Sequence, residues 1–238
     1  MIFSSISPSE IKHFENFSSQ WWDEEGPFAM LHRLNPLRIQ YIKDQVSRSF
    51  HGLSILDVGC GGGVLSEPLA RLGAQVTGLD ASEKNISVAS LHAQEQGLPI
   101  TYVRTSLEDY LATSHQKFDL VIALEVLEHV QNPFSFLEEC TSCLKEDGLL
   151  FVSTFHRTIK SYILGIVFAE YILKWVPKNT HHWRQFIKPS EIYKILSPKG
   201  FMFKDLVGVK YDIRTSSWVL SEDIDVNYMG VLMHVNSS

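Results

Sequence analysis

A glycine-rich run near residue 60 follows a short apolar segment and begins with an acid. It reads Asp57-Val58-Gly59-Cys60-Gly61-Gly62-Gly63. Glycines let a backbone pass close to a ligand, and a helix that begins after such a loop presents free N–H groups. A second acid, Asp80, ends the next apolar segment, where a carboxylate can accept hydrogen bonds from both hydroxyls of a ribose. These residues predict a site for a nucleoside-containing cofactor.

The spacing of the glycines separates two kinds of nucleoside cofactor. A dinucleotide site requires G-x-G-x-x-G, but position 64 is Val64 and the glycines stand as G-x-G-x-G. An acid followed by this pattern resembles the first motif of the S-adenosylmethionine-dependent methyltransferases. For that ligand, Asp57 would accept a hydrogen bond from the ammonium group of the amino-acid tail. Gly59 and Gly61 would let the ribose and the tail lie against the backbone.

A third group of chemistry-bearing residues stands in the run EVLEHV, directly after the apolar segment FDLVIAL. If the run is helical, its spacings of three and four place Glu125, Glu128 and His129 on one face. His129 can then act as a general base that a neighbouring carboxylate orients. Alternatively, the three side chains can bind a divalent cation such as Mg²⁺ that acidifies a hydroxyl group. A purely structural role is the third interpretation, and the sequence leaves the three open.

Apolar runs that alternate with helical patterns must position these residues. The predicted strands cover residues 53–59, 75–80, 100–105, 118–124 and 148–154, with helices over 64–73, 82–96 and 133–145. Continuous apolar strands joined by helices indicate a parallel sheet that is covered on both faces. The fold class is therefore α/β, with a doubly wound sheet whose carboxyl edge carries the three groups.

The remaining segments organise one domain over residues 1–238. The sequence predicts an N-terminal helical cap at 1–50, a cofactor-binding core at 51–154, an insertion at 155–187 and closing strands at 188–238. Within the cap, Asn35 and Pro36 predict the start of a helix that continues to about Val46.

Composition excludes several classes of protein. The chain has 238 residues, 45% hydrophobic residues and a net charge of −6, values typical of a globular domain and unsuited to broad nucleic-acid binding. The three cysteines provide no disulfide framework, and the first residues lack the features of a secretory signal or a transit peptide. These features predict a cytoplasmic protein that does not bind nucleic acid and favour a bacterial origin.

Longer stretches of the chain resemble one family, the ubiquinone-biosynthesis O-methyltransferases. The resemblance spans about residues 14–229 and is carried by WWDEEGPFAMLHRLNPLR, LDVGCGGGVLSEPLARLGAQVTGLDAS, ALEVLEHV, AEYILKWVPKNTHHWRQFIKP and DVNYM. It implies the class I methyltransferase fold, with a seven-stranded sheet, an antiparallel last strand and an inserted helical subregion. It also implies S-adenosylmethionine as cofactor and polyprenylated phenols and catechols as substrates, with two O-methylation steps. Other enzymes of ubiquinone biosynthesis are implied partners.

The same resemblance assigns cofactor contacts to Arg38, Gly59, Asp80 and Leu124. The family often has methionine where this chain has Leu124, a change between apolar side chains of similar size. Leu107, which follows the third predicted strand, is a candidate to flank the adenine. Eukaryotic members of the family are associated with a divalent metal at the EVLEHV motif. A methyltransferase for another phenol and a non-catalytic cofactor-binding subunit remain the alternative functions.

The insertion carries a candidate membrane-binding segment at residues 159–178. It combines an apolar stretch with Lys160, Lys174, Trp175 and Lys178, a composition that suits a helix lying on anionic lipid. Because the ubiquinone precursors carry a long isoprenoid, the substrate is held in a bilayer. We therefore expect a peripheral protein on the cytoplasmic face of the inner membrane. A core helix of the insertion is the alternative.

Overall fold

One mixed β-sheet forms the centre of the computed structural model, which describes residues 11, 15–164 and 183–235. Its strands follow the order β3-β2-β1-β4-β5-β8-β6-β7. Strands β1 to β5 are parallel to one another, and β8 is antiparallel to β5 and β6. The strand bounds are β1 Ser54–Val58, β2 Gln75–Asp80, β3 Thr101–Arg104, β4 Phe118–Leu124, β5 Leu144–Phe155, β6 Phe201–Asp212, β7 Ser217–Ser221 and β8 Asn227–His234.

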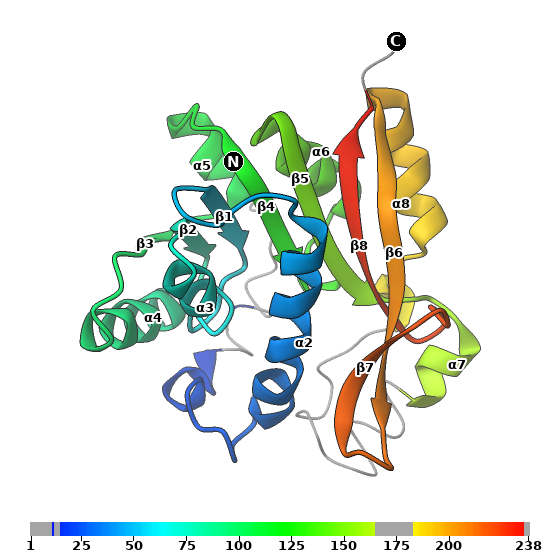
Figure 1. The fold of residues 1–238 in the computed structure, drawn as a ribbon, viewed down its shortest axis with the longest axis horizontal. Coiled ribbons are helices and arrows are strands. Elements are labelled where there is room, and N and C mark those ends of the chain that lie inside the picture. The colour runs from blue at the N-terminus through cyan, green and yellow to red at the C-terminus, as the bar shows by residue number, and fades with distance from the viewer. Residues whose placement is uncertain (1–10, 12–14, 165–182, 236–238) are drawn as a thin grey trace.

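Helices cover both faces of this sheet (Figure 1). One apolar cluster joins the sheet to α5, α6 and α8, and a second joins the opposite face to α2 and α3. The helix bounds are α2 Ala29–Gln45, α3 Ser66–Arg71, α4 Glu83–Glu95, α5 Leu107–Thr113, α6 Pro133–Ser142, α7 Ile159–Ser161 and α8 Pro189–Leu196. This three-layer arrangement confirms the predicted doubly wound α/β fold.

Local sequence signals explain where the helices beside the cofactor loop begin and end. Ser82 caps α4 by accepting a hydrogen bond from the backbone N–H of Asn85, as expected of a serine at that position. Gly97 follows α4 with a positive φ of 66°, a backbone conformation that glycine adopts without strain. The helix therefore starts directly after Asp80, which fixes that acid at the carboxyl end of β2.

Two structural predictions were wrong in detail. The sheet has eight strands within the described residues rather than seven, because β7 pairs antiparallel with the far end of β6 and extends the edge. Helix α2 begins at Ala29, not at Asn35, and contains Pro36 in its interior. The Nδ2 atom of Asn35 donates to the carbonyl of Val64 at 2.8 Å, so the side chain ties α2 to the glycine loop instead of starting a helix.

Candidate active site

The glycine loop between β1 and α3 is held against the end of β2. The backbone N–H groups of Gly59 and Cys60 both donate to the carbonyl of Leu79, at 2.8 and 2.9 Å. Gly59 and Gly61 have φ values of 72° and 54°, which a residue with a side chain rarely adopts. The loop therefore keeps its close backbone path because glycine stands at these positions, and it lies at the carboxyl edge of the parallel strands.

Asp57 is the buried acid at the start of this loop. Its carboxylate is 3% exposed and accepts a hydrogen bond from the hydroxyl of Ser66 at 2.5 Å. Burial raises the pKa of Asp57 to about 7, and the nearby charge of Asp80 adds to this rise. A cationic group placed against Asp57 would stabilise its ionised form, which fits the ammonium group predicted for this position.

Asp80 is fixed by three donors at the carboxyl end of β2. Its Oδ2 accepts from the backbone N–H of Gly61 at 3.0 Å, and its Oδ1 accepts from the N–H of Ser82 at 2.8 Å. The side-chain amide of Asn85 donates to Oδ1 at 3.3 Å. Burial raises the pKa of Asp80, although these hydrogen bonds favour the ionised form. The acid and the glycine loop are thus one hydrogen-bonded unit.

The N-terminal segment covers this unit through Trp21. The indole N–H of Trp21 donates to Oδ1 of Asn85 at 2.9 Å, which connects it to Asp80. A Cβ atom added at Gly62 would lie 2.3 Å from Cγ of Trp21, so the ring packs directly on the loop. The sequence analysis did not select Trp21 or Asn85. The Trp-Trp pair in an otherwise polar segment is the signal that could have indicated the first of them.

A second polar cluster lies at the same edge of the sheet and centres on Glu125. Its Oε1 accepts from the guanidinium of Arg38 at 3.2 Å, from the hydroxyl of Ser153 at 2.7 Å and from the amide of Asn227 at 3.1 Å. Glu125 has a φ of 57°, a left-handed conformation that costs energy for a residue with a side chain. Such strain is typical of functional sites, and here three elements, α2, β5 and β8, hold it in place.

Glu128 is the second acid of this cluster and is 2% exposed. The hydroxyl of Thr154 donates to its Oε2 at 2.8 Å. Burial and the charge of Glu125 raise the pKa of Glu128 well above its usual value. Burial also raises the pKa of Glu125, but Arg38 and the hydrogen bonds from Ser153 and Asn227 outweigh it, so that pKa is lowered. The surroundings therefore favour the protonated form of Glu128 and the ionised form of Glu125.

The run EVLEHV is not helical, so the condition for a shared face is not met. Leu127–His129 is a single 3₁₀ turn, and the left-handed Glu125 precedes it, so the three side chains do not share a helix face. In the part of the chain that the structure describes, no group of three His, Cys, Asp or Glu side chains is arranged to hold a metal ion. Arg38, Ser153 and Asn227 donate to Glu125, and Thr154 donates to Oε2 of Glu128, while Oε1 of Glu128 has no partner among the described residues. A divalent cation at Glu125, Glu128 and His129 therefore stays a prediction.

The other predicted site residues lie at different depths. Arg38 is 4% exposed and reaches across from α2 to Glu125. Leu124 ends β4 and is half-buried, next to Glu125. Leu107 is 2% exposed and belongs to the apolar cluster under α5 and α6, so its role beside an adenine remains a prediction. His129 is half-buried in the turn after Glu128.

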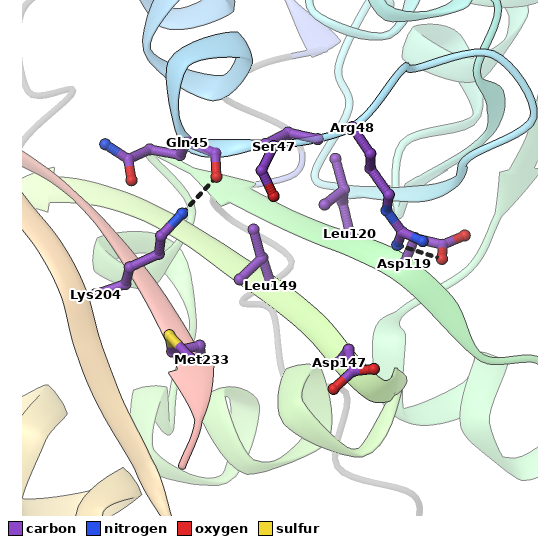
Figure 2. A pocket seen from close by; sticks show the side chains of 10 residues that line it. Gln45, Ser47, Arg48, Asp119, Leu120, Asp147, Leu149, Lys204 and Met233 are labelled. Carbon is purple, nitrogen blue, oxygen red and sulfur yellow. Dashed lines mark hydrogen bonds and ion pairs between the residues drawn. The ribbon is translucent and has the colours of Figure 1, made fainter.

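A hollow of about 220 Å³ lies at the opposite, amino edge of the sheet (Figure 2). Figure 2 shows Arg48 directed at Asp119, and Lys204 directed at the carbonyl of Gln45. Because the chain's own groups pair these charges, and because none of the predicted site residues lines the hollow, it is not the candidate active site.

Comparison with known proteins identifies the family. A model of the methyltransferase domain matches residues 56–152, which include the glycine loop, Asp80 and the EVLEHV run. A ubiquinone biosynthesis O-methyltransferase from Parvibaculum lavamentivorans is 45% identical over 238 residues, covering 96% of this chain and 94% of the relative. This chain belongs to the ubiquinone biosynthesis O-methyltransferase family. A member from Caulobacter vibrioides is also 45% identical and covers 94% of this chain and 93% of its own.

Solved structures of other methyltransferases share the fold of this family member. Magnesium protoporphyrin IX methyltransferase from Synechocystis, with bound S-adenosylhomocysteine, has a TM-score of 0.65 and 23% identity, and the match covers 94% of this chain and 95% of that one. A methyltransferase from Aquifex aeolicus gives a TM-score of 0.58 at 17% identity, covering 96% and 99%. These likenesses confirm the predicted class I, Rossmann-like fold.

Proposed function

We propose that the chain transfers a methyl group from S-adenosylmethionine to the hydroxyl of polyprenylated phenols and catechols, in both O-methylation steps of ubiquinone biosynthesis. The observation that carries this proposal is the placement of two polar clusters at one edge of the sheet. One cluster, around Asp57 and Asp80, suits a cofactor with an ammonium group and a ribose. The other cluster, around Glu125, suits the hydroxyl-bearing ring of a substrate that lies beside the cofactor. The family membership supplies the reaction.

Each cofactor contact follows from the chemistry of its residue. The Asp57 carboxylate attracts the ammonium group of the methionine tail, and Asp80 accepts from the ribose hydroxyls. Gly59 and Gly61 allow the tail to lie against the loop. Arg38 offers the N–H groups of its Nη1 to the tail carboxylate, while Nη2 stays on Glu125. Leu124 and Leu107 contribute apolar contacts.

The methyl group moves by in-line displacement, in which a phenol oxygen attacks the methyl carbon and the thioether leaves. Holding the two reactants in line lowers the barrier by several kcal/mol, roughly 7 at the lower end of measured cases. A free phenol has a pKa of about 10, so a base must take its proton near neutral pH. His129 stands in the turn beside the clusters and is the imidazole we assign to this step. Glu125 already accepts hydrogen bonds from Arg38 and Asn227, so we assign it the role of positioning these two residues rather than of accepting the proton.

Labelled S-adenosylmethionine and a short-tailed polyprenyl catechol test this function directly. We expect label in the methyl ether product, and a loss of at least about 100-fold in kcat for His129→Ala, as is typical when a general base is removed. His115→Ala is the matched control, because His115 is exposed and precedes β4 at the amino edge. Cofactor binding without transfer, to this catechol and to a short-tailed demethylubiquinol, would instead identify a non-catalytic subunit.

We also propose that the segment at residues 159–178 contacts the membrane and that the protein works on the cytoplasmic face of a bacterial inner membrane. Most of this segment, residues 165–178, lies outside the described residues. At its described start, Ile159, Ile163 and Leu164 are apolar and exposed, which supports contact with lipid. No helix among the described residues has the length and apolarity to cross a bilayer. The relatives come from bacteria, and their pathway supplies the other enzymes that we propose as partners.

Vesicle flotation tests the membrane contact. We expect Ile163→Asp combined with Leu164→Asp to reduce binding to vesicles that contain anionic lipid. Ile213→Asp is the matched control, since Ile213 is an exposed isoleucine on the loop between β6 and β7. Equal flotation of the double variant and the control would reject the membrane role of this segment.

A further inference from the structure

Two residues from distant parts of the chain bind the same oxygen of Glu125. Nη2 of Arg38 donates to Oε1 at 3.2 Å, and Nδ2 of Asn227 donates to Oε1 at 3.1 Å and to Oε2 at 3.3 Å. Arg38 lies on α2 and Asn227 begins β8, so the fold brings both to the carboxyl end of β4. The sequence analysis assigned no function to Asn227.

Each of these residues keeps one buried polar atom that has no hydrogen-bond partner among the described residues. The atoms are Nε of Arg38, which can only donate, and Oδ1 of Asn227, which can only accept. The two residues are 4% and 8% exposed. Buried polar atoms are normally hydrogen-bonded, so a partnerless donor and acceptor on two residues that share one carboxylate indicate a polar ligand.

The orientation of the Asn227 amide is fixed by its neighbour. Reversing the amide would place Oδ1 against both oxygens of Glu125, which is a contact between acceptors. The free group of Asn227 is therefore a carbonyl oxygen that requires a donor. A hydroxyl group can serve both kinds of free atom, because it donates to an oxygen such as Oδ1 and accepts from an N–H such as Nε. An ether oxygen accepts from Nε but leaves Oδ1 without a partner.

We propose that Asn227 and Arg38 bind the non-reacting hydroxyl that stands next to the methylated hydroxyl on the substrate ring. This inference rests on the proposed function and explains how the site selects catechols over simple phenols. The adjacent hydroxyl lies between the two free atoms, and Glu125 holds both residues in place. Asn227 is then a specificity residue that contacts substrate.

Ligand binding to the S-adenosylhomocysteine-loaded protein tests this assignment by calorimetry. We expect the wild-type protein to bind a short-tailed catechol about 10- to 100-fold more tightly than the same ring with one hydroxyl. Asn227→Ala should reduce this preference to about threefold or less. Asn132→Ala is the control and should keep the preference, because Asn132 is exposed and its side chain caps α6. An Asn227→Ala protein that keeps the full preference would overturn the proposal.

A second measurement needs no substitution. The 1,3-dihydroxy isomer carries its second hydroxyl one ring position farther from the reacting one, so the wild-type protein should bind it as weakly as the ring with one hydroxyl. Binding as tight as that of the catechol would reject the role of Asn227. If the wild-type protein methylates the catechol but shows no preference, only this inference fails. If it neither binds nor methylates the catechol, the proposed function fails as well.

Discussion

Strand β4 has an acid near each end, and the two acids differ in their hydrogen-bond and ion-pair partners. At the amino end, Asp119 accepts from Arg48 and Lys145, each at 2.7 Å, and from the backbone and hydroxyl of Ser54. Burial raises the pKa of Asp119, but these donors outweigh it and hold the pKa far below its usual value. The chain therefore satisfies this acid by itself, as structural ion pairs do.

At the carboxyl edge of the sheet, burial rather than ion pairing dominates most of the acids that the structure describes. Arg38 is paired with Glu125, while burial raises the pKa of Asp57, Asp80 and Glu128. Acids with raised pKa values and strained backbone concentrate at functional sites. The amino edge of the sheet therefore neutralises its own charges. The carboxyl edge can instead accept a ligand that carries a positive charge and hydroxyl groups.

Removing the acid at each end of β4 should produce the largest effect. Glu125→Ala leaves the guanidinium of Arg38 buried without its partner, which should lower the free energy of unfolding by about 3–5 kcal/mol. Asp119→Ala should cost only about 1–2 kcal/mol, because Arg48 and Lys145 are half-exposed and return to water. Urea unfolding of both variants measures the difference, and equal losses would contradict the comparison.

The pH dependence of stability should reveal Asp57. Its pKa in the folded protein is about 7, above the value in the unfolded chain, so the folded state binds the proton more tightly. The stability contribution of Asp57 is greatest when it is protonated and is lost as the pH rises toward 7. Between pH 5 and pH 8 the wild-type protein should lose about 2–3 kcal/mol relative to Asp57→Asn. Parallel urea-unfolding profiles for the two proteins would show that Asp57 is ionised throughout.

Cofactor affinity should depend on the charge of Asp80. Asp80→Asn replaces one oxygen with a donor and removes the charge-assisted bonds to the ribose. We expect S-adenosylmethionine to bind about 10- to 100-fold more weakly, measured by calorimetry. Asp119→Asn, at the other edge of the sheet, should bind the cofactor as the wild-type protein does. A similar loss in both variants would mean that the effect comes from general destabilisation.

A smaller effect should come from the contact between the glycine loop and Trp21. Gly62→Ala places a Cβ against Trp21 and should destabilise the protein by about 1–2 kcal/mol. Because the clash is with one side chain, Trp21→Ala combined with Gly62→Ala should lose less than the sum of the single losses. Thermal unfolding of the three variants tests the contact, and additive losses would show that Trp21 does not constrain Gly62.

The sequence predicted the carboxyl-edge acids because each stands at or just beyond the carboxyl end of an apolar strand. Parallel strands place such residues at one edge, so the positions of Asp57, Asp80 and Glu125 followed from hydrophobic patterning and topology alone. The glycine loop added a close backbone path. These signals are local, so a single sequence is enough to detect them.

Long-range contacts were not predictable in the same way. Asn227 and Trp21 reach the clusters from β8 and from the N-terminal segment, and no periodicity links them to residues 57–129. The run EVLEHV is not helical because Ser153 holds Glu125 in a left-handed conformation. The carbonyl of Ser153 accepts from the backbone N–H of Glu125, and the hydroxyl of Ser153 donates to its Oε1. Strand β7 was missed because it is a short edge strand with no fully buried residue, which leaves little apolar pattern to detect.

Hydrogen–deuterium exchange with S-adenosylhomocysteine and a short-tailed catechol would show which edge of the sheet binds the ligands. We predict new protection at the carboxyl edge, in the peptides that cover residues 57–63, 80–85 and 125–129. The peptides that contain Gln45 to Arg48 and Asp119, around the hollow at the amino edge, should exchange as before. Protection confined to those amino-edge peptides would contradict the assignment of the active site.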